Sequence, residues 1–184
     1  MNQQKKIIIT NMPSSTSMYS ESKIKVVVKP RPYVSIATLA ACCIEKGIKV
    51  KCLDLDSSTN PGKTMTDVLN EYKPDYICFS FSTPLFNECC EFAKFIREKH
   101  KDVILVAGGV HGSIYPKEVL QKSVIDIVVM GEGDFVLPEI VLSQDLSKVR
   151  GIGYKKDGEI KINPRQPPLE SLDILPMPAW HLFD

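Results

Sequence analysis

The sequence predicts an α/β fold built on a doubly wound parallel sheet. Five short apolar runs recur over the first 130 residues, and a segment of helical character follows each of them. This unbroken alternation is typical of a parallel sheet with right-handed crossovers and helices on both faces. Because the first run lies near the N-terminus and there are five runs, we expect a flavodoxin-like (Rossmann-like) five-stranded sheet of order 2-1-3-4-5 rather than a six-stranded Rossmann sheet.

The predicted strands are short and rich in β-branched residues. They are KIIIT at 6–10, IKVKCL at 48–53, DYICFSF at 75–81, VILVA at 103–107 and DIVVM at 126–130. The last three are apolar almost without interruption, as strands covered on both faces should be. Helical periodicity and end signals predict the helices, which are 35–46, 65–72, 85–100, 116–122 and 135–143.

The pattern changes after Leu146. The stretch GIGYKKDGEIKINP has two short strands around a Lys-Asp-Gly turn, which predicts a β-hairpin. We therefore divide the chain into an α/β domain at 1–147, a hairpin appendage at 148–164 and a proline-rich linker at 165–184. Tyr33 and Trp180 are the aromatic residues that we expect at an interface with another domain.

Composition narrows the function without naming it. A formal net charge of +1 gives no basic surface typical of nucleic-acid binding, so we expect no nucleic-acid partner. The N-terminus MNQQKKIIIT has the features of neither a signal peptide nor a membrane span, so we expect a cytoplasmic protein that does not bind a membrane. The six cysteines are expected to be reduced core residues. Because no C-x3-C-x2-C run occurs, this chain alone cannot supply three thiolates to a four-iron cluster.

Small residues gather in the loops where a ligand would bind. In a doubly wound sheet, ligands bind outside the carboxyl ends of the strands. Glycine ends two successive strands, in GGVHGSIYP and GEGDF, and would let a flat ligand or a phosphate approach the backbone. Either glycine pair alone is equally well explained by a tight turn. Together with the hydroxyls of SFSTPLF on the neighbouring strand end, they favour a ligand.

The chain also resembles a known family over nearly its whole length. The matching stretches, in order, are PRPYVSIATLAACCIEKGIKVKCLD, PDYICFSFST, VAGGVHGSIYPKEVL, DIVVMGEGDFVLPEIV, GIGYKKDGEIKINP and LDILPMPAW. They resemble the N-terminal cobalamin-binding domain of cobalamin-dependent radical SAM enzymes, including relatives of the anaerobic magnesium-protoporphyrin IX monomethyl ester cyclase.

The resemblance implies where cobalamin would lie. The corrin ring would cover the strand ends, and the nucleotide tail would enter a groove between the sheet and the helices. Ser80, Ser82 and Thr83 would line the tail groove. The loop residues that would contact the tail, its ribose, the ring or the ring amides are Gly108, Gly109, Val110, His111, Gly131, Glu132 and Gly133.

No protein ligand to cobalt is expected. Methionine-synthase-like modules carry a D-x-H-x-x-G loop after the first strand, whereas this chain has TNMPSSTSMY there, without histidine. The residues that could approach the lower face of the ring are Asn11, Met12 and Tyr19. We do not expect His111 to bind cobalt, because a lone histidine more often caps a helix or makes a hydrogen bond.

The same resemblance implies a larger enzyme. A C-terminal radical SAM domain in the same chain would supply a 4Fe-4S cluster and S-adenosylmethionine, and the whole would transfer a methyl group or perform other radical chemistry. The domain alone is not expected to be active, and its residues do not identify the substrate.

Two other functions stay open from the residues themselves. In a flavodoxin-like flavin or nucleotide binder, the hydroxyls of PSSTS would meet a phosphate. In a cofactor-free interaction module, the glycine turns would only shape the scaffold. A phosphoryl-accepting receiver domain is poorly supported, because the places of its acidic and lysine residues are held by Asn11, Ser80, Ser82 and Gly131.

Overall fold

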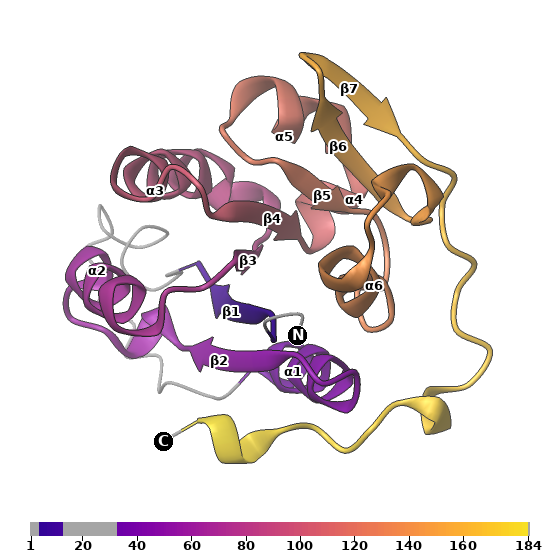
Figure 1. Cartoon of the computed structure of the whole chain (residues 1–184), viewed down its shortest axis with the longest axis horizontal. Helices are drawn as coiled ribbons and strands as arrows, with labels where there is room; N and C mark the ends of the chain where they lie inside the picture. The colour runs from indigo at the N-terminus through magenta and orange to yellow at the C-terminus, as the bar shows by residue number, and fades with distance from the viewer. Residues whose placement is uncertain (1–3, 13–32, 184) are drawn as a thin grey trace.

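The five predicted strands form and lie parallel in the predicted order. The computed structural model describes residues 4–12 and 33–183, in which helices cover both faces of one sheet (Figure 1). The pairing order is β2-β1-β3-β4-β5, so the predicted topology is confirmed. The strands are β1 (Lys6–Asn11), β2 (Lys49–Leu53), β3 (Tyr76–Ser80), β4 (Ile104–Gly108) and β5 (Ile127–Val129).

The hairpin is part of the sheet, which has seven strands rather than five. Strand β6 (Ile152–Lys156) pairs antiparallel with β5, and β7 (Glu159–Ile162) pairs antiparallel with β6. This pairing satisfies the backbone groups along the outer edge of β5, which would otherwise be unpaired. Asp157 and Gly158 both have positive φ, of 53° and 78°, as a two-residue type I′ hairpin turn requires.

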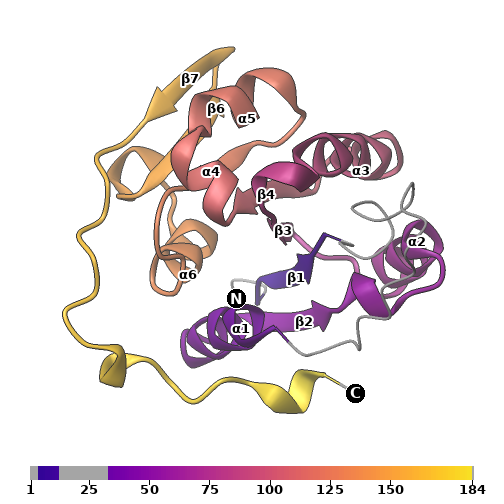
Figure 2. The same cartoon turned by 180° about the vertical axis from the view of Figure 1, so that it is seen from behind.

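The helices form two layers. Helices α1 (Val34–Glu45) and α6 (Val136–Leu142) cover one face of the sheet. The opposite face carries α2 (Pro61–Tyr72), α3 (Phe86–Lys99) and α5 (Pro116–Lys122), as Figure 2 shows from behind.

Two differences from the predicted helices have local causes. Helix α2 begins four residues early, because Asn60 accepts a hydrogen bond from the Lys63 amide and Pro61 suits a first turn. A short helix α4 (Val110–Ile114) forms in the expected loop after β4, and its five residues are too few for a periodic pattern.

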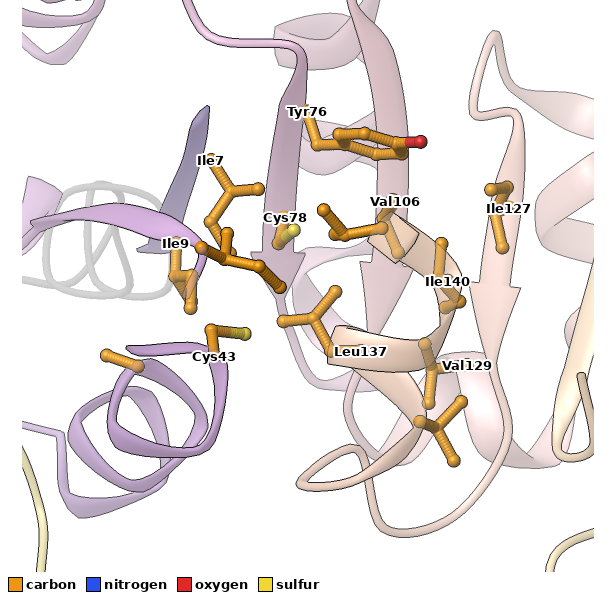
Figure 3. Close-up of a cluster of buried hydrophobic side chains, with 14 of the residues drawn as sticks. Ile7, Ile9, Cys43, Tyr76, Cys78, Val106, Ile127, Val129, Leu137 and Ile140 are labelled. Carbon is orange, nitrogen blue, oxygen red and sulfur yellow. The ribbon is translucent and has the colours of Figure 1, made fainter. Parts of the chain in front are cut away.

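Alternate residues of each strand build the two cores. On β1, Ile7 and Ile9 face α1 and α6, whereas Ile8 faces α2 and α3. Figure 3 shows strand side chains meeting Cys43 of α1 and Leu137 of α6. This alternation explains why both faces of the sheet are apolar.

Five of the cysteines are core residues, as predicted, and Cys90 is partly buried. None of the six forms a disulfide. Burial raises the pKa of the Cys42 thiol to about 11 and that of Cys52 to about 12, which keeps both protonated at neutral pH. In residues 4–12 and 33–183 no group of three or more His, Cys, Asp or Glu side chains is placed to hold a metal ion. Over the same residues, no helix has the length and apolar character needed to span a membrane.

Residues 165–183, called the C-terminal segment below, return from the hairpin past α6 to α1 (Figures 1 and 2). Besides two short 3-10 turns, the C-terminal segment has no regular element. Near its end, the Ala179 amide donates to the Ala37 carbonyl at 3.0 Å, and Ala179 is buried against the core under α1. Trp180 stays 43% exposed, whereas Tyr33 packs against that core and donates to Asp56. The interface predicted for these aromatic residues stays a prediction.

Gly109 allows its loop to lie close against the backbone of Phe81 at the edge of the sheet. Its φ is +91°, and a Cβ there would lie 2.5 Å from the Phe81 carbonyl oxygen. At Gly131 φ is +95°, but a Cβ would meet no atom within 4 Å.

We expect Gly109→Ala to lower the free energy of unfolding by about 3 kcal/mol or more, because strained φ and overpacking each cost about 1–3 kcal/mol. Gly131→Ala is the matched control and should cost only about 1–2 kcal/mol, since it adds strain without a clash. Urea denaturation of the two variants measures the difference. Equal losses would contradict the role given to the Gly109 contact.

Candidate functional site

A pocket of about 240 Å³ opens at the carboxyl ends of the strands, between the sheet and helices α1 and α6. Its walls are mostly apolar, with glycine backbone at the strand ends. The strands contribute Ile9, Cys78, Phe79, Ser80, Val106, Ala107, Gly108 and Val129. The loops and helices contribute Ser35, Leu39, Gly109, Gly131, Glu132, Gly133, Asp134 and Leu137.

Half of the predicted site residues meet at this pocket. They are Ser80, Gly108, Gly109, Gly131, Glu132 and Gly133. They come together because β3, β4 and β5 are neighbours in the sheet and end at the same edge. The two glycine loops therefore lie next to each other, as the sequence reasoning required.

Several lining residues were missed from the sequence. Asp134 and Leu137 follow the second glycine loop, and Ser35 and Leu39 belong to α1. The apolar lining carried a usable signal, because Ile9, Cys78 and Val106 are direct register partners on β1, β3 and β4. Alternation along the predicted strands would have placed them on one face. No comparable signal shows which residues of α1 turn toward the pocket.

Five other predicted residues lie elsewhere on the same edge or in the core. Ser82, Thr83 and Val110 are exposed beyond the strand ends and do not line the pocket. Asn11 is buried, and its side chain donates to Asp54 at 3.2 Å and accepts from the Leu55 amide at 2.9 Å. The fifth, His111, is described next. Tyr19, the remaining residue of the predicted site, lies outside the described residues.

His111 is buried on the face of the sheet opposite the pocket. Its ring lies 4.4 Å from that of Phe86 and 5.4 Å from that of Tyr115, measured between centroids, and Nδ1 lies 3.3 Å from the Thr83 hydroxyl. Burial lowers the pKa of His111, which favours the neutral ring. Its predicted contact with a ligand is therefore not one that this pocket makes.

Ser113 joins the two glycine loops, a role that no sequence pattern indicated. Its hydroxyl donates to the Gly109 carbonyl and accepts from the Gly131 amide, each at 2.9 Å. One short side chain on α4 thus fixes the spacing of two segments that line the pocket.

The C-terminal segment makes hydrogen bonds to the two loops beside the pocket. The Arg165 guanidinium donates to the Ser113 carbonyl at 2.5 Å, and the Leu169 amide donates to the Glu132 carboxylate at 2.9 Å. We expected Glu132 to accept a hydrogen bond from a ligand, but it already accepts one from the C-terminal segment, although its side chain remains exposed.

Comparison with known proteins bears on what such a pocket holds. The model of the B12 binding domain family matches residues 25–141, which is more than half of the chain. The chain belongs to this family. B12 is cobalamin, so the resemblance read from the sequence is confirmed at the level of the family.

Two curated relatives extend the comparison. This B12-binding domain is 27% identical over 170 residues to an uncharacterized methyltransferase, PH0819, of Pyrococcus horikoshii, covering 89% of the chain and 37% of the relative. It is 31% identical over 121 residues to the anaerobic magnesium-protoporphyrin IX monomethyl ester cyclase of Rubrivivax gelatinosus, covering 61% of the chain and 22% of the relative. The chain thus spans well under half of either relative.

A solved structure shares the fold. The cobalamin-dependent S-adenosylmethionine radical enzyme OxsB, with aqua-cobalamin and S-adenosylmethionine bound, superposes with a TM-score of 0.76 at 21% identity. The match covers 96% of this chain and 24% of OxsB. At this identity, the match supports the B12-binding domain's fold.

We expect Ser113→Ala to speed hydrogen exchange of the Gly131 amide and to lower the free energy of unfolding by about 1 kcal/mol, the net worth of a lost hydrogen bond. NMR exchange and urea denaturation measure the two effects. Ser113→Thr keeps the hydroxyl and is the matched control. If Ser113→Ala left Gly131 exchange unchanged, Ser113 would not be joining the loops.

Proposed function

We propose that this domain holds cobalamin at the carboxyl edge of its sheet, with the nucleotide tail in the pocket and the corrin ring above the strand ends. The observation that carries the proposal is the pocket itself, which is lined by two glycine loops and, apart from Ile9, by residues of the segment matched by the family model. Ligands of doubly wound sheets bind at this edge.

The pocket fits part of the cofactor. Its volume of about 240 Å³ is below the roughly 300–1,000 Å³ of pockets that enclose whole small molecules. It therefore has room for one base and its sugar, and the large ring must stay outside. The apolar walls suit an aromatic base, and the space above Gly131, where a Cβ would meet no atom within 4 Å, admits a ligand to the backbone.

The predicted site residues take different parts in this arrangement. The wall along the cofactor's nucleotide tail is formed by Ser80, Gly108, Gly109, Gly131 and Gly133. Glu132 instead joins the rim of the pocket to the C-terminal segment of the protein. The exposed residues beyond the strand ends, Ser82, Thr83 and Val110, face the ring. His111 supports Thr83 from the core, whereas Asn11 fixes the loop after β2 through Asp54 and Leu55. Tyr19 remains a candidate for the lower face of the ring.

We further propose that the domain works within a longer radical SAM enzyme of the cytoplasm. Residues 1–147 with the hairpin at 148–164 would bind cobalamin, and 165–184 would lead to a catalytic domain with a 4Fe-4S cluster and S-adenosylmethionine. Support comes from the names of the relatives and from the fraction of their length that this chain spans. Cobalamin would supply methyl transfer or related radical chemistry there, while this chain would position the cofactor and exclude water from its tail.

The first test is retention of the cofactor. The purified chain, incubated with hydroxocobalamin and desalted, should keep about one corrinoid per chain by its visible spectrum, because the pocket is preformed. Flavin mononucleotide is the parallel control and should be lost. A folded but colourless protein would count against cobalamin binding by this chain, and retention of flavin would favour a flavodoxin-like function.

A matched pair of glycine variants tests the location. A Cβ at Gly133 would lie 3.1 Å from Cδ2 of Leu39, which also lines the pocket, so the added methyl group must change the pocket wall. At Gly62 a Cβ would meet only ordinary contacts of 3.7 Å or more. Gly133→Ala should weaken hydroxocobalamin binding about tenfold, which corresponds to 1.4 kcal/mol. Gly62→Ala should bind like the parent chain in the same titration. Equal affinities of the two variants would place the tail elsewhere.

A further inference from the structure

Two acids follow β5, and only one of them faces the pocket from a half-buried position. Glu132 is exposed, and its carboxylate accepts from the Leu169 amide. Asp134 is half-buried and lines the pocket between Gly133 and Leu137. Sequence reasoning singled out Glu132 and passed over Asp134, and the structure separates the two.

Asp134 makes no contact that would explain it as a structural residue. An aspartate here would commonly cap the following helix, but the residue before α6 is Phe135, and no side chain caps that helix. Among the described residues, no hydrogen bond or ion pair joins the Asp134 carboxylate to the side chain or backbone of another residue.

The surroundings of Asp134 disfavour its charge. Burial raises the pKa of Asp134, and the negative charge of Glu132 raises it further. Toward α1, Asp134 is close enough to influence the Cys42 and Cys43 thiols, which are neutral. A half-buried carboxyl without a partner reduces stability, because burial removes hydrogen bonds to water that nothing replaces. Such a group is explained when a ligand supplies the missing donor.

The chemistry of the cobalamin tail limits which of its groups can donate a hydrogen bond to Asp134. An aspartate oxygen accepts hydrogen bonds and repels anions, so it cannot face the tail's phosphate. The benzimidazole base carries no N–H or O–H once it is joined to the ribose. The tail's neutral donors are the ribose hydroxyls and the amide N–H of the linker that joins the tail to the ring. In the proposed arrangement this linker lies beside the ring, outside the pocket, so the ribose hydroxyls are the donors that the pocket admits.

We infer that Asp134 accepts a hydrogen bond from a ribose hydroxyl of the cobalamin nucleotide tail and so orients the tail in the pocket. The inference rests on the proposed function. It assigns the acceptor role to Asp134, whereas Glu132 fastens the loop to residues 165–183.

Asp134→Ala should weaken hydroxocobalamin binding about tenfold or more, since a hydrogen bond to a charged group contributes about 1.5–3 kcal/mol. Asp134→Asn keeps an acceptor oxygen and should lose less. Glu139→Ala, which removes an exposed carboxylate from α6, is the matched control and should bind like the parent chain. Titration followed by visible absorbance measures all four dissociation constants.

A second measurement separates ligand contact from a structural role. The melting temperature of the cobalamin-free Asp134→Asn chain at neutral pH should equal or exceed that of the parent, because the pKa of Asp134 is raised in the folded chain and its charge is therefore unfavourable there. A residue that held the fold would instead lower the melting temperature when replaced.

The outcomes are distinct. Weaker cobalamin binding with an undiminished melting temperature supports the inference. Unchanged affinity in Asp134→Ala, or an equal loss for cobinamide, which lacks the nucleotide tail, overturns it. If the parent chain itself retained no corrinoid, the proposed function would fail, and this result is visible before any variant is compared.

Discussion

The in-register pairing of β1, β3 and β4 determines where every other part of the site lies. Asn11, Ser80 and Gly108 are neighbours across three strands, so these strands end at one level. The loops that follow therefore start side by side, and the apolar residues one step back form a common wall under α1 and α6. A shift of one residue in any strand would exchange its two faces and remove that wall.

The two faces of the sheet meet this edge differently. On the α3 side, Phe81, Phe86 and His111 close the edge with packed rings. On the α1 side, glycine and small side chains leave the pocket. Gly109 serves both faces, because its close approach to Phe81 brings the loop down to the sheet and its carbonyl accepts from Ser113. The pocket thus depends on dense packing directly behind it.

Sequence patterns predicted what is periodic or local. The strands, the Lys-Asp-Gly hairpin turn and the glycine loops followed from short-range rules. The strand order followed from the few topologies that an unbroken β-α alternation allows. The pairing of the hairpin with β5, the bonds of Ser113 and the different surroundings of Glu132 and Asp134 could not be read, because they join segments far apart in the chain. His111 shows the same limit: its loop was placed correctly, yet one turn of α4 directs its ring into the core.

The C-terminal segment can couple its own contacts to ligand binding in the pocket. Residues 165–183 are bonded to Ser113, to Glu132 and to Ala37, which belong to three segments around the pocket. If a bound ligand changes the free energy of these contacts, then docking of the C-terminal segment must change the free energy of ligand binding by the same amount, because such coupling is reciprocal. A restraint applied to residues 165–183 would then change how long the ligand stays bound.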